Sequence, residues 1–267
     1  MPPLITHAAR YSLLTVELPG QAAVTAGVLL EDPRADRVLI RMRRDWDLVA
    51  PEEAEVLSAL EDDLSAQAAA QGATQFFARL EDTLSNTVRV GERREAMVED
   101  FERALGRLYR QHVTSHVQEF RTHLPRYSLE VAAGPFLENQ AVEKEGWEEA
   151  PPGLRLTPEM FVARIAGRSM EPLIPDGSLC VFRRGASGGS LAGSRQGRLV
   201  LVEALGEAGH DRYTVKRYQS KKEHLPDGTW RQDQIRLEPL NPEFDAWDLA
   251  PEEDRYRILA EFVQVVD

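Results

Sequence analysis

The sequence predicts an α+β module in residues 1–127, followed by a strand-rich region in residues 128–267. A chain of 267 residues is long enough for two domains. Its hydrophobic fraction of 42% and its charged fraction of 28% are typical of globular proteins. In the second region, the apolar runs at residues 178–182, 213–217 and 257–266 read as strands.

The first 45 residues predict a small antiparallel meander. Residues 11–16, 23–30 and 37–42 are short apolar runs with the character of strands. Residues 32–36 contain the Asp and Pro typical of turns, and they join the second run to the third. The N-terminal region therefore begins as a sheet.

Two helices are expected after this meander. Proline and acidic side chains at residues 51–53 open the first helix, which runs to about Gln71. Residues 83–90 are expected to form a short strand or a loop. From about residue 92 to residue 113, apolar side chains recur at helical spacing and predict a second, amphipathic helix; they are Met97, Phe101, Leu105, Leu108 and Tyr109.

Ser169 and Lys216 are the candidate catalytic residues. The serine lies in the turn-like run Gly167-Arg168-Ser169-Met170-Glu171-Pro172, and the lysine lies 47 residues later in an apolar strand. The chain has only four lysines, so a lysine inside such a strand stands out. A serine hydroxyl needs a base to become a nucleophile. A desolvated lysine can lose its proton and act as that base, whereas arginine keeps its proton.

Each run also has a plain structural reading. A lone Gly-x-Ser-x-x-Pro run is usually an ordinary turn. A lone Val-Lys-Arg run is usually an edge strand whose charges are solvated. The order and spacing of the runs favour the functional reading over these alternatives, although the fold could be present with its chemistry unused.

Taken together, these runs resemble the S24 peptidase domain of LexA-type repressors and UmuD-type mutagenesis proteins. The likeness covers roughly residues 128–267 and rests on four elements: the serine turn at 167–172, the strand Val215-Lys216-Arg217, the run Val131-Ala132-Ala133-Gly134 about 35 residues before Ser169, and residues 237–244. It implies a mostly-β, β-ribbon fold for residues 128–267, with a cleavage segment at residues 128–160.

The resemblance also implies an activity. Ser169 would attack the Ala133–Gly134 bond of the same chain, and Lys216 would be the general base. The backbone amides of Arg168 and Ser169 would form the oxyanion hole. Its context would be a regulatory switch in an SOS or stress response, and a recombinase filament is a candidate activating partner.

The charge of the chain argues against a general nucleic-acid binder. The net charge is −12, and residues 1–130 carry 15 arginines against 21 acidic residues. Affinity for the phosphate backbone is supplied mostly by positive charge. A LexA-type repressor would also need a helix-turn-helix near its N-terminus, where this sequence predicts strands. Direct DNA binding is therefore doubtful.

Other features are assigned structural roles, and neither a metal nor a cofactor is expected. Cys180 is the only cysteine and reads as a small core side chain. His112 and His116 could share a helix face and hold a metal, but solvent-facing positions at a helix end are preferred. The acidic run 143–149 reads as a solvated loop. The Gly- and Ser-rich run 183–194 reads as a flexible loop, without the lysine that a phosphate-binding loop needs.

Residues 257–266 predict a C-terminal strand that would be an exposed edge unless covered. A homodimer through this strand is therefore expected, as the resemblance also implies. No apolar run approaches the roughly 20 residues that cross a bilayer, and no signal peptide is evident, so a cytoplasmic protein is expected. Three functions remain open: a self-cleaving peptidase, a LexA-like regulator, and a dimeric interaction protein with an unused Ser–Lys pair.

Overall fold

The computed structural model describes residues 6–83, 87–133, 144–185, 195–205, 212–224, 230–249 and 256–266. The chain divides into two compact units, Met1–His116 and Val117–Val266. Residues 117–127, which the sequence grouped with the first module, supply a strand to the sheet of the second unit. Over the described residues, every helix is too short or too polar to cross a membrane.

The N-terminal unit is built on the predicted meander. Strands β1 (His7–Val16), β2 (Val24–Asp32) and β3 (Arg37–Met42) pair antiparallel in that order. Two further strands, β4 (Val88–Val90) and β5 (Arg94–Val98), pair with successive parts of the free edge of β1. The three predicted strands are confirmed within a few residues of their bounds, because the apolar runs that predicted them lie within the paired segments.

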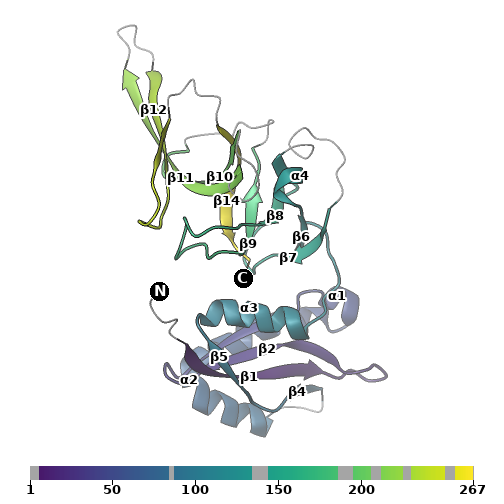
Figure 1. Ribbon diagram of the computed structural model, residues 1–267. Coiled ribbons are helices and arrows are strands. Elements are labelled where there is room, and N and C mark those ends of the chain that lie inside the picture. Colours follow the sequence, from purple (N-terminus) through teal and green to yellow (C-terminus); the bar gives the residue numbers. More distant parts are fainter. Residues whose placement is uncertain are drawn as a thin grey trace. The chain divides into compact units, whose positions relative to one another are not determined.

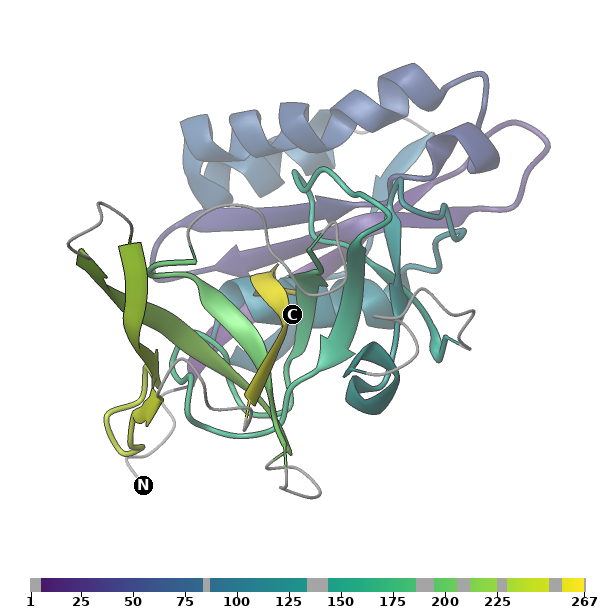
Figure 2. The same ribbon diagram turned by 90° about the horizontal axis from the view of Figure 1, so that it is seen from above.

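Helices cover both faces of this sheet (Figures 1 and 2). Helix α2 (Ala54–Thr83) packs in a core that contains Leu29 of β2, whereas α3 (Phe101–His112) packs in a core that contains the neighbouring Val28 and Leu30. Successive side chains of a strand point to opposite faces, so this alternation places the two helices on opposite sides. A short helix, α1 (Trp46–Val49), contributes the buried Trp46 to the α2 side.

The first predicted helix is longer than expected and is bent. Helix α2 continues to Thr83, with a kink at Gly72, whose φ of 77° favours glycine. The carbonyl and carboxylate of Asp36, in the β2–β3 turn, accept hydrogen bonds from the amides of Ala73 (2.9 Å) and Thr74 (3.1 Å). A contact distant in sequence therefore starts a new helical segment where the sequence suggested an end near Gln71.

The prediction of one helix over residues 92–113 was wrong in its first part. Residues 94–98 form β5, and Met97 is 63% exposed on that strand. The helix begins at Phe101, where the Asp100 carboxylate accepts a hydrogen bond from the Arg103 amide at 2.9 Å. Pairing with β1 satisfies the backbone of residues 94–98, and this tertiary contact overrides the helical spacing of Met97 and Phe101.

Within its described residues, the C-terminal unit is a nine-stranded, almost wholly antiparallel sheet with one short helix, α4 (Leu129–Ala133). Its strand order is β13-β12-β11-β10-β14-β9-β8-β6-β7, and only β6 and β8 run parallel. The long hairpin of β11 and β12 forms a ribbon at one end (Figure 1). The strands are β6 (His123–Arg126), β7 (Gly146–Glu149), β8 (Met160–Arg164), β9 (Leu179–Arg183), β10 (Leu199–Ala204), β11 (Tyr213–His224), β12 (Trp230–Glu238), β13 (Trp247–Leu249) and β14 (Tyr256–Val265).

Two expectations for this unit need correction. Residues 146–149 of the supposed acidic loop form β7, which pairs with β6. The C-terminal strand is not an edge, because β14 pairs with β10 on one side and with β9 on the other. A dimer formed by backbone pairing of residues 257–266 would therefore have to displace one of these strands, so the premise of the homodimer prediction was wrong.

Candidate active site

The predicted nucleophile lies in a turn between β8 and β9 that is fixed at both ends. Gly167, just before Arg168 and Ser169, has a φ of 110°, and its amide donates to the Asp176 carboxylate at 2.7 Å. Gly177 closes the turn with its amide on the Ile165 carbonyl at 2.9 Å. Only glycine adopts the Gly167 conformation readily, which explains that residue of the motif.

Apolar side chains anchor the same turn from inside. Met170 and Ile174 are buried in the core of the unit, immediately after Ser169. Ser169 itself is only 9% exposed, and the Glu171–Pro172 peptide bond is cis. The motif thus combines a glycine for the turn, a buried methionine for anchorage and a serine between them.

The run at residues 237–244 meets the serine turn in space. The amides of Leu240 and Asn241 donate to the Ser169 carbonyl at 2.9 and 3.0 Å. The Asn241 side chain donates through Nδ2 to the Arg168 carbonyl at 3.0 Å. Two motifs about 70 residues apart in sequence are therefore joined by three hydrogen bonds.

Lys216 lies on the interior strand β11, opposite Val200 of β10, and is 3% exposed. Burial lowers the pKa of its amine to about 8. Over the described residues no carboxylate forms an ion pair with it, and its Nζ lies 5.0 Å from the centre of the Trp247 ring. The strand thus presents a lysine whose charge is disfavoured and not neutralised by a partner.

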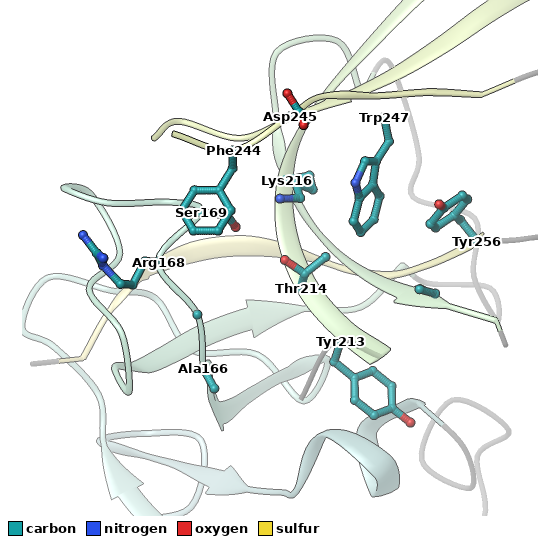
Figure 3. Close-up of a pocket in the computed structure, with 12 residues that line it drawn as sticks. Ala166, Arg168, Ser169, Tyr213, Thr214, Lys216, Phe244, Asp245, Trp247 and Tyr256 are labelled. Carbon is teal, nitrogen blue, oxygen red and sulfur yellow. The ribbon is translucent and has the colours of Figure 1, made fainter. Parts of the chain in front are cut away.

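Ser169 and Lys216 line the same cavity, whose volume is about 510 Å³. Figure 3 shows the Lys216 side chain pointing toward Ser169, with Trp247 on its other side. Over the described residues no hydrogen bond joins Ser169 Oγ to Lys216 Nζ. Arg168 and Ser169, whose backbone amides are the predicted oxyanion hole, are both among the residues that line this cavity.

Sequence reasoning missed the aromatic walls of this cavity. Four aromatic side chains line it: Tyr213, Phe244, Trp247 and Tyr256. Trp247 and Tyr256 pack with ring centres 4.9 Å apart. Phe244 closes the run at residues 237–244 and could have been found from that motif, whereas Trp247 and Tyr256 reach the site only through strand pairing.

The structure does not bring Ala133 to this cavity. Ala133 ends α4 and is buried in the core that contains Leu201, Val215 and Leu259. Lys216 follows Val215 along β11 and therefore faces the other side of the sheet, toward the core of Val200 and Tyr218. Gly134, the other half of the predicted cleavage bond, lies outside the described residues.

A charged cluster holds the Ala133 carbonyl on its side of the sheet. The Arg257 guanidinium donates to that oxygen and also pairs with Glu203 at 2.7 Å. Glu203 is 1% exposed and binds a second arginine, Arg212, at 2.8 Å. Tyr213, the cross-strand neighbour of Glu203, has a raised pKa because of burial.

The remaining candidate residues lie elsewhere. Cys180 is fully buried in β9, as expected for a core side chain. His112 ends α3 and stacks on Tyr11, whereas His116 lies beyond the helix, so the two histidines share no helix face. Over the described residues no group of His, Cys, Asp or Glu side chains is arranged for a metal. Residues 186–194 of the Gly- and Ser-rich run lie outside the described residues.

A second buried charge network lies in the N-terminal unit. The Arg43 guanidinium makes two hydrogen bonds, of 2.8 and 2.9 Å, to the Asp45 carboxylate, and both side chains are buried. His116 also binds this carboxylate through its amide (2.6 Å) and Nδ1 (2.8 Å). Although burial opposes ionisation, the hydrogen bonds from Arg43 and His116 hold the pKa of Asp45 well below its usual range.

The C-terminal half is thus a mostly-β unit with a serine and a buried lysine in one cavity, and a family match identifies it as a serine-peptidase-like domain with a LexA/UmuD-like fold. The chain belongs to the Peptidase S24-like family, whose model matches residues 125–263. The match begins after the N-terminal unit, for which it assigns nothing. A search of curated proteins found no match.

Proposed function

We propose that the protein is a Ser–Lys peptidase that cleaves its own chain between Ala133 and Gly134. The observation that carries this proposal is the shared cavity of Ser169 and Lys216, with the lysine pKa lowered to about 8. At that pKa roughly a tenth of the lysine amines are neutral at pH 7 and roughly nine tenths at pH 9. A competent base is thus present near neutral pH.

The chemistry would proceed in two steps. The neutral Lys216 amine takes the Ser169 proton as Oγ attacks the Ala133 carbonyl carbon. The amides of Arg168 and Ser169 stabilise the oxyanion. The bond to the Gly134 nitrogen then breaks, and Lys216 returns the proton to this leaving amine. Water, activated by Lys216, hydrolyses the Ala133 ester and regenerates the serine.

The position of α4 makes this reaction conditional. Ala133 is buried on the sheet face opposite Lys216, and its carbonyl is held by Arg257. The segment must therefore leave this position before the Ala133 carbonyl can reach Ser169. An activating protein, such as the recombinase filament that the resemblance implies, would act by favouring the docked position. This property suits a regulatory switch.

The transcriptional-regulator alternative has less support. Strands β1 to β3 occupy the first part of the described chain, where a helix-turn-helix would be needed. A protein with an unused Ser–Lys pair is the alternative that the distance of Ala133 from the cavity favours. The alternative with an unused Ser–Lys pair predicts an intact chain when the purified protein is incubated alone. The regulator alternative is distinguished instead by selective binding to a defined DNA duplex.

The direct test is incubation of the purified protein from pH 7 to pH 10, followed by mass spectrometry. We expect fragments 1–133 and 134–267, with a rate that rises about tenfold from pH 7 to a plateau above pH 9, because deprotonating Lys216 activates it. Ser169→Ala should stay intact. A cut at another bond, or an intact wild-type chain across this range, would overturn the proposal.

A further inference from the structure

The Asn241 side chain is held in one orientation between two backbone groups. Its Oδ1 accepts a hydrogen bond from the Glu243 amide at 3.0 Å, which directs Nδ2 to the Arg168 carbonyl at 3.0 Å. Asn241 is 8% exposed, so solvent competes little for these bonds. The residue does not line the cavity of Ser169 and Lys216.

The hydrogen bond from Asn241 to the Arg168 carbonyl also orients the neighbouring peptide N–H, that of Ser169. The Arg168 C=O and the Ser169 N–H belong to one planar trans peptide group, in which they point in opposite directions. Holding the carbonyl therefore sets the direction of the N–H. Over the described residues, the backbone amides of Arg168 and Ser169 donate no hydrogen bond. They are thus available to an oxyanion.

We infer that Asn241 is a positioning residue that aims the Ser169 N–H at the oxyanion of the substrate. The inference rests on the proposed peptidase function but concerns a residue that touches neither the nucleophile side chain nor the base. A donor aimed in advance is worth more than one that must reorient during the reaction. Asn241 should therefore affect the chemical step and leave the titration of Lys216 unchanged.

Two substitutions separate this role from a merely structural one. Asn241→Asp keeps the acceptor for the Glu243 amide but cannot donate to the Arg168 carbonyl, and Asn241→Ala removes both bonds without adding charge. Glu243→Gln is the matched control, because Glu243 lies in the same loop as Asn241 and the change alters only its exposed carboxylate. This carboxylate lies 3.7 Å from the Arg168 guanidinium. The backbone amide of residue 243 is retained in that control.

The experiment follows two reactions of Ser169 as a function of pH: self-cleavage, and labelling by a fluorophosphonate. In labelling, the Ser169 Oγ–phosphorus bond forms, the phosphorus–fluorine bond breaks, fluoride leaves, and Lys216 takes the serine proton. The phosphonyl oxygen occupies the oxyanion hole. We expect both Asn241 variants to lower the alkaline plateau of both reactions by about tenfold to a hundredfold. The control should match the wild type.

The pH profile decides between the two roles. With a positioning role, the inflection near pH 8 stays in place in Asn241→Ala while the plateau falls. With a structural role, loosening of the cavity hydrates Lys216 and moves the inflection upward, and this result would overturn the inference. Unchanged plateaus would overturn it as well.

The two reactions also separate the inference from the proposed function. A wild-type protein that is labelled at Ser169 but never cuts itself would reject self-cleavage alone, and the variants would still decide the role of Asn241 by labelling. A wild-type protein that is neither labelled nor cut would reject both.

Discussion

The two faces of strands β10 and β11 bury charge in opposite ways. On one face Lys216 is 3% exposed and has no carboxylate partner over the described residues. On the other face Glu203 is 1% exposed and binds both Arg212 and Arg257. The two residues lie on neighbouring strands of one sheet, so their difference comes from their partners and not from their depth.

This difference separates a reactive charge from a structural one. A buried charge that is fully paired keeps its ionised form, and removing one partner leaves the other charge unpaired. A buried ammonium without a carboxylate partner is unfavourable, so the side chain loses its proton more easily. The pKa of Lys216 therefore falls to about 8. The Arg43–Asp45 pair of the N-terminal unit resembles Glu203 in this respect, because both of its charges are buried and paired.

The largest expected effect is that of Lys216→Met, which replaces the unpartnered charge with an apolar side chain of similar length. Self-cleavage should fall by more than about a thousandfold, because the base is lost. Stability at pH 7 should hold or rise by up to about 3 kcal/mol, because the charged form no longer has to be buried.

The pH dependence of unfolding sharpens this prediction. Between pH 8 and the usual lysine pKa, the unfolded wild-type chain binds more protons at this site than the folded chain does, so wild-type stability gains with rising pH. Lys216→Met should lack this gain in urea titrations at pH 7 and pH 10. A loss of stability at pH 7 would show that Lys216 is a structural charge.

Asp45→Ala should have the converse effect. It leaves the Arg43 guanidinium, only 4% exposed, without its carboxylate, and should destabilise the N-terminal unit by about 3–5 kcal/mol. The folded pKa of Asp45 is depressed, so the wild-type contribution is present above the unfolded pKa near 4 and is lost as the pH falls. Calorimetry at pH 7 and pH 3 measures both effects.

The control for this prediction is Asp63→Ala, at an exposed position of α2. It should leave the melting temperature nearly unchanged. Fluorophosphonate labelling of Ser169 should differ by less than about twofold between Asp45→Ala and the wild type. If Asp45→Ala changes the free energy of unfolding only slightly at pH 7, the Arg43–Asp45 pair does not stabilise the N-terminal unit.

Local patterns in the sequence predicted the elements that local physics determines. Short apolar runs predicted β1, β2 and β3, because each of these strands contributes side chains to the core on the α2 side and to the core on the α3 side. The glycine and proline of the serine turn predicted a fixed loop, and the apolar surroundings of Lys216 predicted a buried amine. Family membership agrees with the resemblance that these motifs suggested.

Contacts distant in sequence determined what the patterns missed. Pairing with β1 made residues 94–98 a strand despite their helical spacing. Asp36 placed a new helical segment after Gly72. The strand at residues 256–265 read as an edge only because its neighbours β9 and β10 lie far away in the sequence. The hydrogen bond from Asn241 to Arg168 likewise had no local signal.

The smallest expected effect is that of Arg257→Gln. This change weakens the hydrogen bond to the Ala133 carbonyl on the face of the sheet that carries Glu203. A hydrogen bond from a charged donor contributes about 1.5–3 kcal/mol, so its loss should let α4 leave its position more often. Self-cleavage at pH 8 should become about tenfold faster, while the inflection set by Lys216 stays in place. Time courses of fragment formation measure the rate.

Arg236→Gln is the matched control, because Arg236 pairs with Asp248 at 3.0 Å on the surface of the same unit, and it should cleave at the wild-type rate. Fluorophosphonate labelling should be equal in both variants, since the small probe does not need α4 to move. If Arg257→Gln cleaves no faster while it is labelled normally, the hold on Ala133 does not limit the reaction. The slow step would then be the docking of the segment at Ser169, and the contacts on the Glu203 face of the sheet would not control the rate of self-cleavage.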